Sequence, residues 1–314
     1  MTGDPVIDWL LEGDPAIRWQ VLRDLLRLDK SEYGPERERV ATEGWGRQLL
    51  ERQDPDGLWS RSLYNGKWTS TTYSLYLLKL LGLAPRHPQA LLGCRRLLDS
   101  GLYGRREIRL SKKAETPDLG VTALVLSLCS YFGLEDDSLF LLARHIIDQQ
   151  KRDGSWLPND SPGAGDYTFE TTLLALDALV QSWGVLAGGP EGYSSLAAVR
   201  KGRQFLLGHD LYLASGNPIK TAWESFSFPP YWFYDVLTVL DHLRATGATP
   251  SPRMQRAVEL VERRRGGDGR WKLGAAHRGK TFFDMERAGR PSRWNTLRAL
   301  RVLDWWVNLK SEEQ

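Results

Sequence analysis

A short segment that occurs three times constrains this chain more than any other feature. Each copy reads Gln or Arg, three residues, Gly, one residue and Trp, with Asp directly before the Gly; the copies are Gln53–Trp59, Gln150–Trp156 and Arg265–Trp271. Asp-Gly favours a tight turn because glycine adopts positive φ without a steric penalty. Each copy follows one helical pattern and precedes another, so the sequence predicts a repeated helical hairpin.

Two weaker copies fill the gaps, with Tyr103 and Tyr212 in place of the tryptophan. The five aromatic residues lie 44 to 59 residues apart, which is long enough for one pair of helices per repeat.

The helical patterns between these turns form two alternating sets of six. The amphipathic set, expected in an outer layer, covers 6–12, 36–53, 88–100, 136–150, 194–207 and 252–265. The set expected in an inner layer, several of whose members are apolar on nearly all sides, covers 15–28, 70–81, 118–132, 169–182, 231–245 and 292–306. Because no strand-like alternation persists, we expect an all-α fold.

Charge and cysteine content narrow the class of protein. The net charge of +3 is too balanced, and the basic residues too scattered, for a nucleic-acid binder. Two cysteines cannot form a disulfide framework, which indicates a cytoplasmic setting. Residues 1–8 lack a signal-peptide pattern, and the most apolar stretch, 119–134, is too short and too polar to span a bilayer. We expect no transmembrane segment, while contact with a membrane surface stays open.

The repeated turn resembles the QW repeat of squalene and hopene cyclases, which occurs in related form in the β-subunits of protein prenyltransferases. The resemblance rests on the three strong copies and, through the order of the repeats, covers most of the chain. It implies a single-domain (α/α)6 toroid over residues 1–314, in which Trp59, Trp156 and Trp271 brace neighbouring hairpins.

The sequence departs from both families at their functional motifs. It lacks the Asp-x-Asp-Asp acid motif of class II cyclases and their second α-barrel domain; its nearest acid run, 135–137, is expected to cap a helix. The prenyltransferase zinc ligands are Asp, Cys and His, but no Asp stands two residues before Cys94 or Cys129. We expect both cysteines to be small buried residues, and we expect neither a metal nor a cofactor.

Aromatic residues gather where the inner helices begin, and in a ring those N-termini converge at one end. The segment 223–235 alone holds seven aromatics in thirteen residues, and its paired prolines fit the start of a helix. One such residue is more often core than pocket, but the group exceeds what one helix can bury. The expected ligand-binding residues are Trp68, Tyr73, Trp223, Tyr231, Trp232, Arg293 and Trp294.

Four acids accompany these aromatics as catalytic candidates: Glu170, Asp118, Asp235 and Glu224. Asp118 precedes a helix, so capping and a site role are both open. Glu170 lies among apolar residues of an inner helix, where a raised pKa would let it act as an acid. His277 is expected to be a solvated loop residue.

Three functions follow as hypotheses. The first is a cavity for an apolar, isoprenoid-like small molecule, with acid chemistry of the terpene cyclase or prenyl-processing kind. The second is a carbohydrate-active (α/α)6 enzyme with paired carboxylates and tryptophans that stack on sugars. The third is a non-catalytic toroid that binds a partner or a lipid, since a shared fold does not transfer chemistry.

Overall fold

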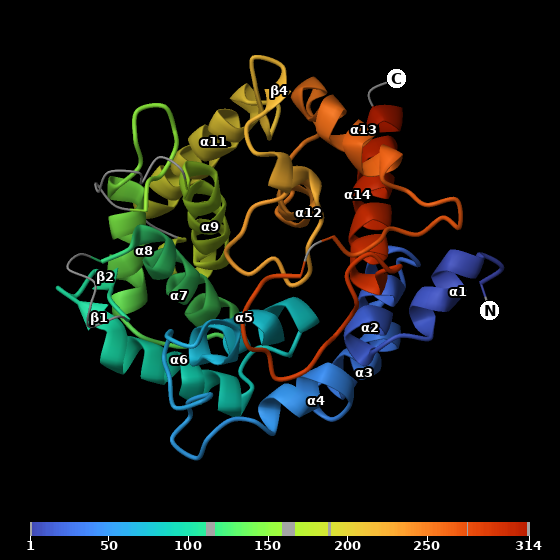
Figure 1. Cartoon of the computed structure of the whole chain (residues 1–314). Coiled ribbons are helices and arrows are strands. Elements are labelled where there is room, and N and C mark those ends of the chain that lie inside the picture. Colours follow the sequence, from blue (N-terminus) through green and yellow to red (C-terminus); the bar gives the residue numbers. More distant parts are fainter. Residues whose placement is uncertain (1, 111–116, 159–166, 188–189, 275, 313–314) are drawn as a thin grey trace. The chain divides into compact units, whose positions relative to one another are not determined.

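The computed structural model describes residues 2–110, 117–158, 167–187, 190–274 and 276–312, and it confirms the all-α fold class (Figure 1). The strands in the described residues are two small antiparallel hairpins. β1 (Leu102–Tyr103) pairs with β2 (Glu107–Ile108), and β3 (Leu213–Ala214) pairs with β4 (Asn217–Pro218). No helix in these described ranges is long and apolar enough to cross a membrane.

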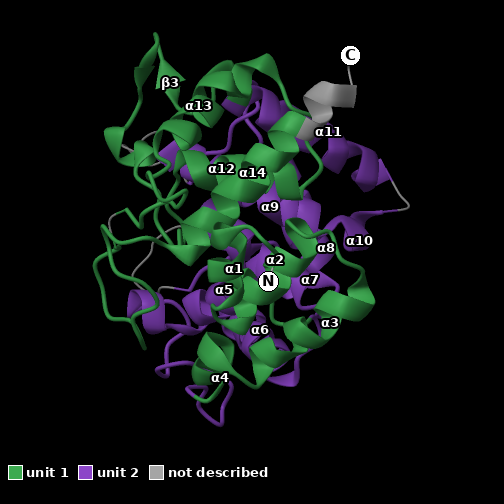
Figure 2. Cartoon of the chain, turned by 90° about the vertical axis from the view of Figure 1, so that its right-hand side faces the viewer, with its two compact units in different colours: residues 1–51, 80–84, 207–314 green, residues 52–79, 85–206 purple. Residues whose placement is uncertain are grey.

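The chain divides into two compact units, each made of several chain segments (Figure 2). Unit 1 comprises Met1–Glu51, Leu80–Ala84 and Leu207–Gln314, and unit 2 comprises Arg52–Lys79 and Pro85–Leu206. The expectation of one domain over 1–314 stays a prediction.

Unit 2 is built around an apolar helix. α7 (Leu119–Tyr131) is buried along nearly its whole length. It packs against α6 (Pro88–Gly101), α8 (Ser138–Asp148) and α9 (Thr168–Gln181). The remaining helices of this unit are η2 (Lys67–Thr69), most of α5 (Thr71–Leu81), α10 (Trp183–Leu186) and most of α11 (Pro190–Gly208).

Unit 1 joins the two ends of the chain. α2 (Pro15–Asp24) packs against α1 (Pro5–Leu11), α3 (Lys30–Glu38) and the last helix, α14 (Arg293–Glu312). α14 also packs against α12 (Val236–Ala245) and α13 (Gln255–Arg263). The shorter helices of this unit are η1 (Arg39–Ala41), α4 (Gly44–Leu50), η4 (Thr221–Glu224) and η5 (Pro252–Met254).

Two expected helices differ from the structure for local reasons. The helix expected over 36–53 is interrupted, because Gly44 has a φ of +61° and a Cβ there would lie 2.0 Å from an Asp14 carboxylate oxygen. The helix expected from Tyr231 begins at Val236 instead. Tyr231 has a φ of +51°, and the Asp235 side chain caps the helix by accepting a hydrogen bond from Thr238 N. The paired prolines therefore precede the helix and do not start it.

The three strong turn motifs share one pattern of contacts. Their glycines have φ between +78° and +93°, and their tryptophans are fully buried. The backbone N–H of each tryptophan donates to a threonine hydroxyl on the following helix at 3.0 Å. The pairs are Trp59 with Thr71, Trp156 with Thr172 and Trp271 with Thr296. The Gln53 and Gln150 side chains also donate to the carbonyl of the glycine in the same turn, at 2.9 Å.

The weak copy at Tyr103 does not follow this pattern. Tyr103 is 42% exposed and lies on β1. The bond to the following helix is made instead by the fully buried Ile108, whose N–H donates to Thr122 Oγ1 at 3.0 Å. In these four repeats the shared contact is therefore a backbone N–H that donates to a threonine of the following helix. The sequence contains these threonines, but the turn motif alone does not reveal them.

We expect Thr172→Val to lower the free energy of unfolding by about 1–3 kcal/mol. Valine keeps the shape of the threonine side chain, but the buried backbone N–H of Trp156 loses its acceptor. Urea unfolding followed by circular dichroism would measure the change. Thr249→Val, at an exposed position, is the control. Equal stability of the two variants would contradict the role of the threonine.

Candidate functional site

Unit 2 brings two of the predicted ligand-binding residues together. The Trp68 ring meets Tyr73 edge-on, with centroids 4.9 Å apart and planes at 81°. The Tyr73 hydroxyl donates to the Tyr64 hydroxyl at 3.1 Å, and these two rings lie 5.4 Å apart. We call Tyr64, Trp68, Tyr73 and Asp118 the aromatic–acid cluster.

The loop that carries Tyr64 is tied to the start of α5. Thr72 donates to the carbonyl of Leu63 from both its N–H and its hydroxyl, at 3.0 and 2.7 Å. Thr71 N donates to the carbonyl of Ser62 at 2.9 Å. These bonds fix Tyr64 over Tyr73, so the cluster is held by backbone contacts as well as by ring packing.

Asp118 is both a helix cap and a member of this cluster. It accepts a hydrogen bond from Val121 N at 3.1 Å and so caps α7. Burial raises the pKa of its carboxyl, while the backbone amides of Val121 and Gly120 moderate the rise. Burial also raises the pKa of Tyr64 and Tyr73, and the nearby charge of Asp118 contributes to both increases. The two interpretations of Asp118 left open by the sequence are therefore compatible.

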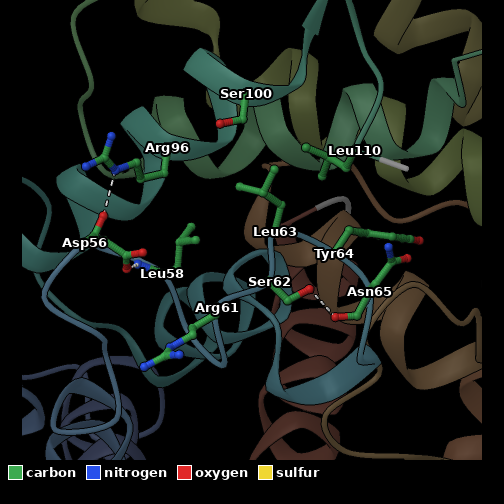
Figure 3. Close-up of a pocket in the computed structure, with 10 residues that line it drawn as sticks. All are labelled: Asp56, Leu58, Arg61, Ser62, Leu63, Tyr64, Asn65, Arg96, Ser100 and Leu110. Atoms are coloured by element: carbon green, nitrogen blue, oxygen red, sulfur yellow. Dashed lines mark hydrogen bonds between the residues drawn. The ribbon is translucent and has the colours of Figure 1, made fainter. Parts of the chain in front are cut away.

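A pocket of about 650 Å³ opens beside Tyr64 (Figure 3). Its apolar lining is Leu58, Leu63 and Leu110, together with the Tyr64 ring. Its polar lining consists of Asp56, Arg61, Ser62, Asn65, Arg96 and Ser100. Arg96 Nε donates to the carbonyl of Asp56 at 2.7 Å, which links α6 to the first turn motif. Sequence reasoning named none of these residues as site candidates. Seven of them lie within residues 56–65, and tertiary contacts bring Arg96, Ser100 and Leu110 to that stretch.

Glu170, the next acid candidate along the chain after Asp118, is buried in the first turn of α9. α9 packs against α7, the helix that Asp118 caps. Its role as an acid stays a prediction.

Unit 1 holds the other predicted aromatics, in packed pairs. Trp294 stacks on Phe228 at 4.0 Å with planes at 11°. The other pairs are Trp223 with Tyr234 at 4.8 Å, Trp232 with Phe233 at 4.2 Å and Tyr231 with His277 at 5.9 Å. Most of these residues lie in the segment before α12, and Trp294 lies at the start of α14.

The polar candidates of unit 1 mainly hold elements together. Asp235 caps α12 and also accepts from Ser227 N at 3.3 Å; burial raises its pKa, and Arg298 moderates the rise. Glu224 forms an ion pair with Arg264 at 3.8 Å. Arg293 Nε donates to the carbonyl of Trp9 at 3.0 Å, and its guanidinium lies 4.4 Å above the Trp9 ring.

Two residues of unit 1 differ from expectation. His277 is not a solvated loop residue: it is partly buried and stacks on Phe233 at 4.1 Å, and burial lowers its pKa to about 4. Glu286 was missed: it accepts a hydrogen bond from Arg293 N at 2.6 Å at the start of α14, and burial raises its pKa. Its position in a long loop gave no periodic signal.

The site prediction as a whole requires residues from both units to line one cavity. Unit 2 carries Trp68, Tyr73, Asp118 and Glu170, and unit 1 carries the remaining candidates. The shared cavity stays a prediction.

Cys94 and Cys129 are fully buried free thiols, and burial raises the pKa of Cys94. Within the described residues, no group of three or more His, Cys, Asp and Glu could hold a metal ion.

Comparisons with known proteins find distant structural likeness and no relatives by sequence. No family model and no curated protein matches the chain. A protein from Actinoplanes is 18% identical with a TM-score of 0.47, over 94% of this chain and 90% of that chain. The type II terpene cyclase MstE from Scytonema is 14% identical, with a TM-score of 0.46 for its apo structure and 0.48 for a variant in complex with geranylgeranyl dihydroxybenzoate. The apo match covers 95% of this chain and 89% of that chain, and the complex 95% and 88%. Likeness at this level assigns no activity, ligand or site residue to this chain.

Proposed function

We propose that the chain binds an apolar, isoprenoid-like molecule at the aromatic–acid cluster of unit 2 and that Asp118 protonates it. The observation that carries the proposal is the packed group of Tyr64, Trp68 and Tyr73, in which the nearby charge of Asp118 contributes to the raised pKa of both phenols. The leucines and the Tyr64 ring of the adjoining pocket supply an apolar surface for the ligand.

The proposed reaction begins with proton transfer from the Asp118 carboxyl to a carbon–carbon double bond. The carboxyl becomes a carboxylate, and the ligand becomes a carbocation. Ring faces stabilise cations, so Trp68 and Tyr73 suit this step. Loss of a proton from another carbon then gives a neutral isomerised or cyclised product, and the proton balance closes when the carboxyl is reprotonated. Terpene cyclase-like acid chemistry is thus the function that this cluster supports best.

The wider form of the proposal includes the candidates of unit 1. Trp223, Tyr231, Trp232, Arg293 and Trp294 would extend the aromatic lining. Glu170, Asp235 and Glu224 would be further acids. The proposal favours Asp118 among the four acids because its charge raises the pKa of Tyr64 and Tyr73, two residues of the ring cluster.

We expect Asp118→Asn to lower conversion of a polyprenyl substrate by about 10²–10⁴-fold while binding changes little. Asparagine still caps a helix, so the change removes the proton and keeps the fold. Incubation with geranylgeraniol or squalene, followed by gas chromatography–mass spectrometry, measures conversion. Tryptophan fluorescence quenching measures binding. Asp137→Asn, at an exposed position at the start of α8 in the same unit and outside the pocket, is the matched control.

The outcomes separate the competing functions. Full conversion by the Asp118→Asn variant would contradict the assigned acid. Binding without conversion by the unmodified chain would favour a non-catalytic binding protein. Conversion should also fall as pH rises through the pKa of Asp118, because only the protonated carboxyl is an acid, and the raised pKa extends activity above the usual range of aspartate.

A further inference from the structure

An apolar surface is exposed on α10 and on the first turns of α11. The exposed fractions are 40% for Trp183, 39% for Val185, 80% for Tyr193 and 53% for Leu196. Of the nine large apolar side chains exposed in the described parts of the chain, four fall within these fourteen residues. Such clustering marks an interaction surface, whereas single exposed apolar residues are ordinary.

The two helices that carry these side chains are in contact with each other. A Cβ at Gly192 would lie 3.7 Å from the Trp183 ring and 3.1 Å from the carbonyl oxygen of Leu186. α10 therefore packs directly on the start of α11. Figure 2 shows both helices at the right-hand edge of unit 2.

Basic residues border the apolar side chains. Tyr193, Leu196 and Arg200 follow the spacing i, i+3, i+7 and so share one face of α11, and Lys201 beside them is exposed. Glu191 is the one acid in the sequence from 183 to 204, and it forms an ion pair with Arg144 at 3.4 Å. The surface thus pairs exposed aromatic and aliphatic groups with an excess of positive charge.

We infer that residues 183–201, apart from 188–189, which lie outside the described ranges, form a surface that binds an anionic lipid membrane. Tryptophan and tyrosine favour the depth of the lipid headgroups, and leucine and valine reach the acyl boundary. Arg200 and Lys201 are attracted to anionic headgroups. Self-association through the same face would bring these cations of two copies onto one interface, which like-charge repulsion disfavours.

This inference stands independently of the proposed function, because it uses none of the cluster or pocket residues. Through this surface the chain would contact the lipid bilayer, in which apolar molecules dissolve.

Flotation of the full chain with vesicles tests the inference. The chain should float with vesicles of phosphatidylcholine and phosphatidylglycerol, bind weakly to phosphatidylcholine alone, and lose binding as salt rises. Tyr193→Ser with Leu196→Ser should lower the partition coefficient by about tenfold or more. Arg200→Gln with Lys201→Gln should lower it by about fivefold for each removed charge.

Matched controls come from the β1–β2 hairpin of the same unit. Tyr103→Ser removes one exposed aromatic, and Arg105→Gln with Arg106→Gln removes two exposed charges, so both should leave partitioning unchanged. Circular dichroism checks that every variant folds. Equal loss in the controls, or no vesicle binding by the unmodified chain, would overturn the inference. So would light scattering that shows a dimer abolished by Tyr193→Ser with Leu196→Ser, since a second copy would then cover the face.

Discussion

Replacing Arg301 by methionine is expected to destabilise the folded chain by about 3–5 kcal/mol, because the buried Asp241 carboxylate then loses its bidentate partner. Only the longer contacts with Arg244 and Arg298, at 3.2 and 3.6 Å, remain. Arg301 on α14 donates through Nε to Asp241 on α12 at 2.6 Å, and through Nη2 to the other oxygen of the same carboxylate. Its Nη1 donates to Gln20 and Asp24 on α2, at 2.8 and 3.1 Å. All of these groups are buried in unit 1, so one side chain joins three helices.

Urea unfolding followed by circular dichroism measures the loss. Arg27→Met is the matched control, since Arg27 pairs at 2.8 Å with Asp304, which lies on α14 like Arg301, but this pair is exposed to solvent. We expect no measurable change in the free energy of unfolding. Removing both charges in Arg301→Met with Asp241→Asn should cost less than the sum of the single changes. A stable Arg301→Met variant would mean that the carboxylates find water or other partners.

The same network predicts a dependence of stability on pH. Burial alone would raise the pKa of Asp241 and Asp24, but neighbouring arginines, chiefly Arg301 for Asp241, hold both below the usual value. An unfolded aspartate has a pKa of about 3.9. The folded state therefore binds fewer protons in acid, and this stabilisation is present above about pH 4 and lost as the pH falls further. The Arg301→Met variant should lose less stability over that range.

Trp156→Ala and Trp271→Ala are each expected to lower the free energy of unfolding by about 3–5 kcal/mol, because both indole rings are fully buried and leave large cavities. Each indole N–H also donates to a backbone carbonyl at 2.7 Å, of Ile146 and Val261 respectively. Tyr103→Ala removes the exposed aromatic of a weak copy and should change stability by less than about 0.5 kcal/mol.

These variants also test the prediction of a single domain, since Trp156 lies in unit 2 and Trp271 in unit 1. One cooperative domain gives a single calorimetric transition that either change shifts as a whole. Two transitions, each shifted by only one of the variants, would show that the units unfold independently and would contradict the closed single-domain toroid.

What the sequence determined by itself is the local structure. Asp-Gly followed by tryptophan predicts the turns because glycine alone reaches the required φ cheaply. The apolar periodicity predicts α5, α7 and α9 to within a few residues because each helix is stabilised by contacts with whatever core surrounds it. The aromatic and acidic candidates were visible for the same reason, as side chains at the starts of such helices.

The partners of those side chains were decided only by the tertiary structure. Arg301 meets Gln20 across 281 positions of the sequence, and no periodicity reports such a pairing. Tyr64 joins Tyr73 and the pocket because Ser62 and Leu63 bind the start of α5, and His277 is partly buried because Phe233 stacks on it. A turn or a helix is specified by energies between neighbours in the chain, whereas a pocket, a shifted pKa or a buried ion pair depends on which distant segments exclude water from it.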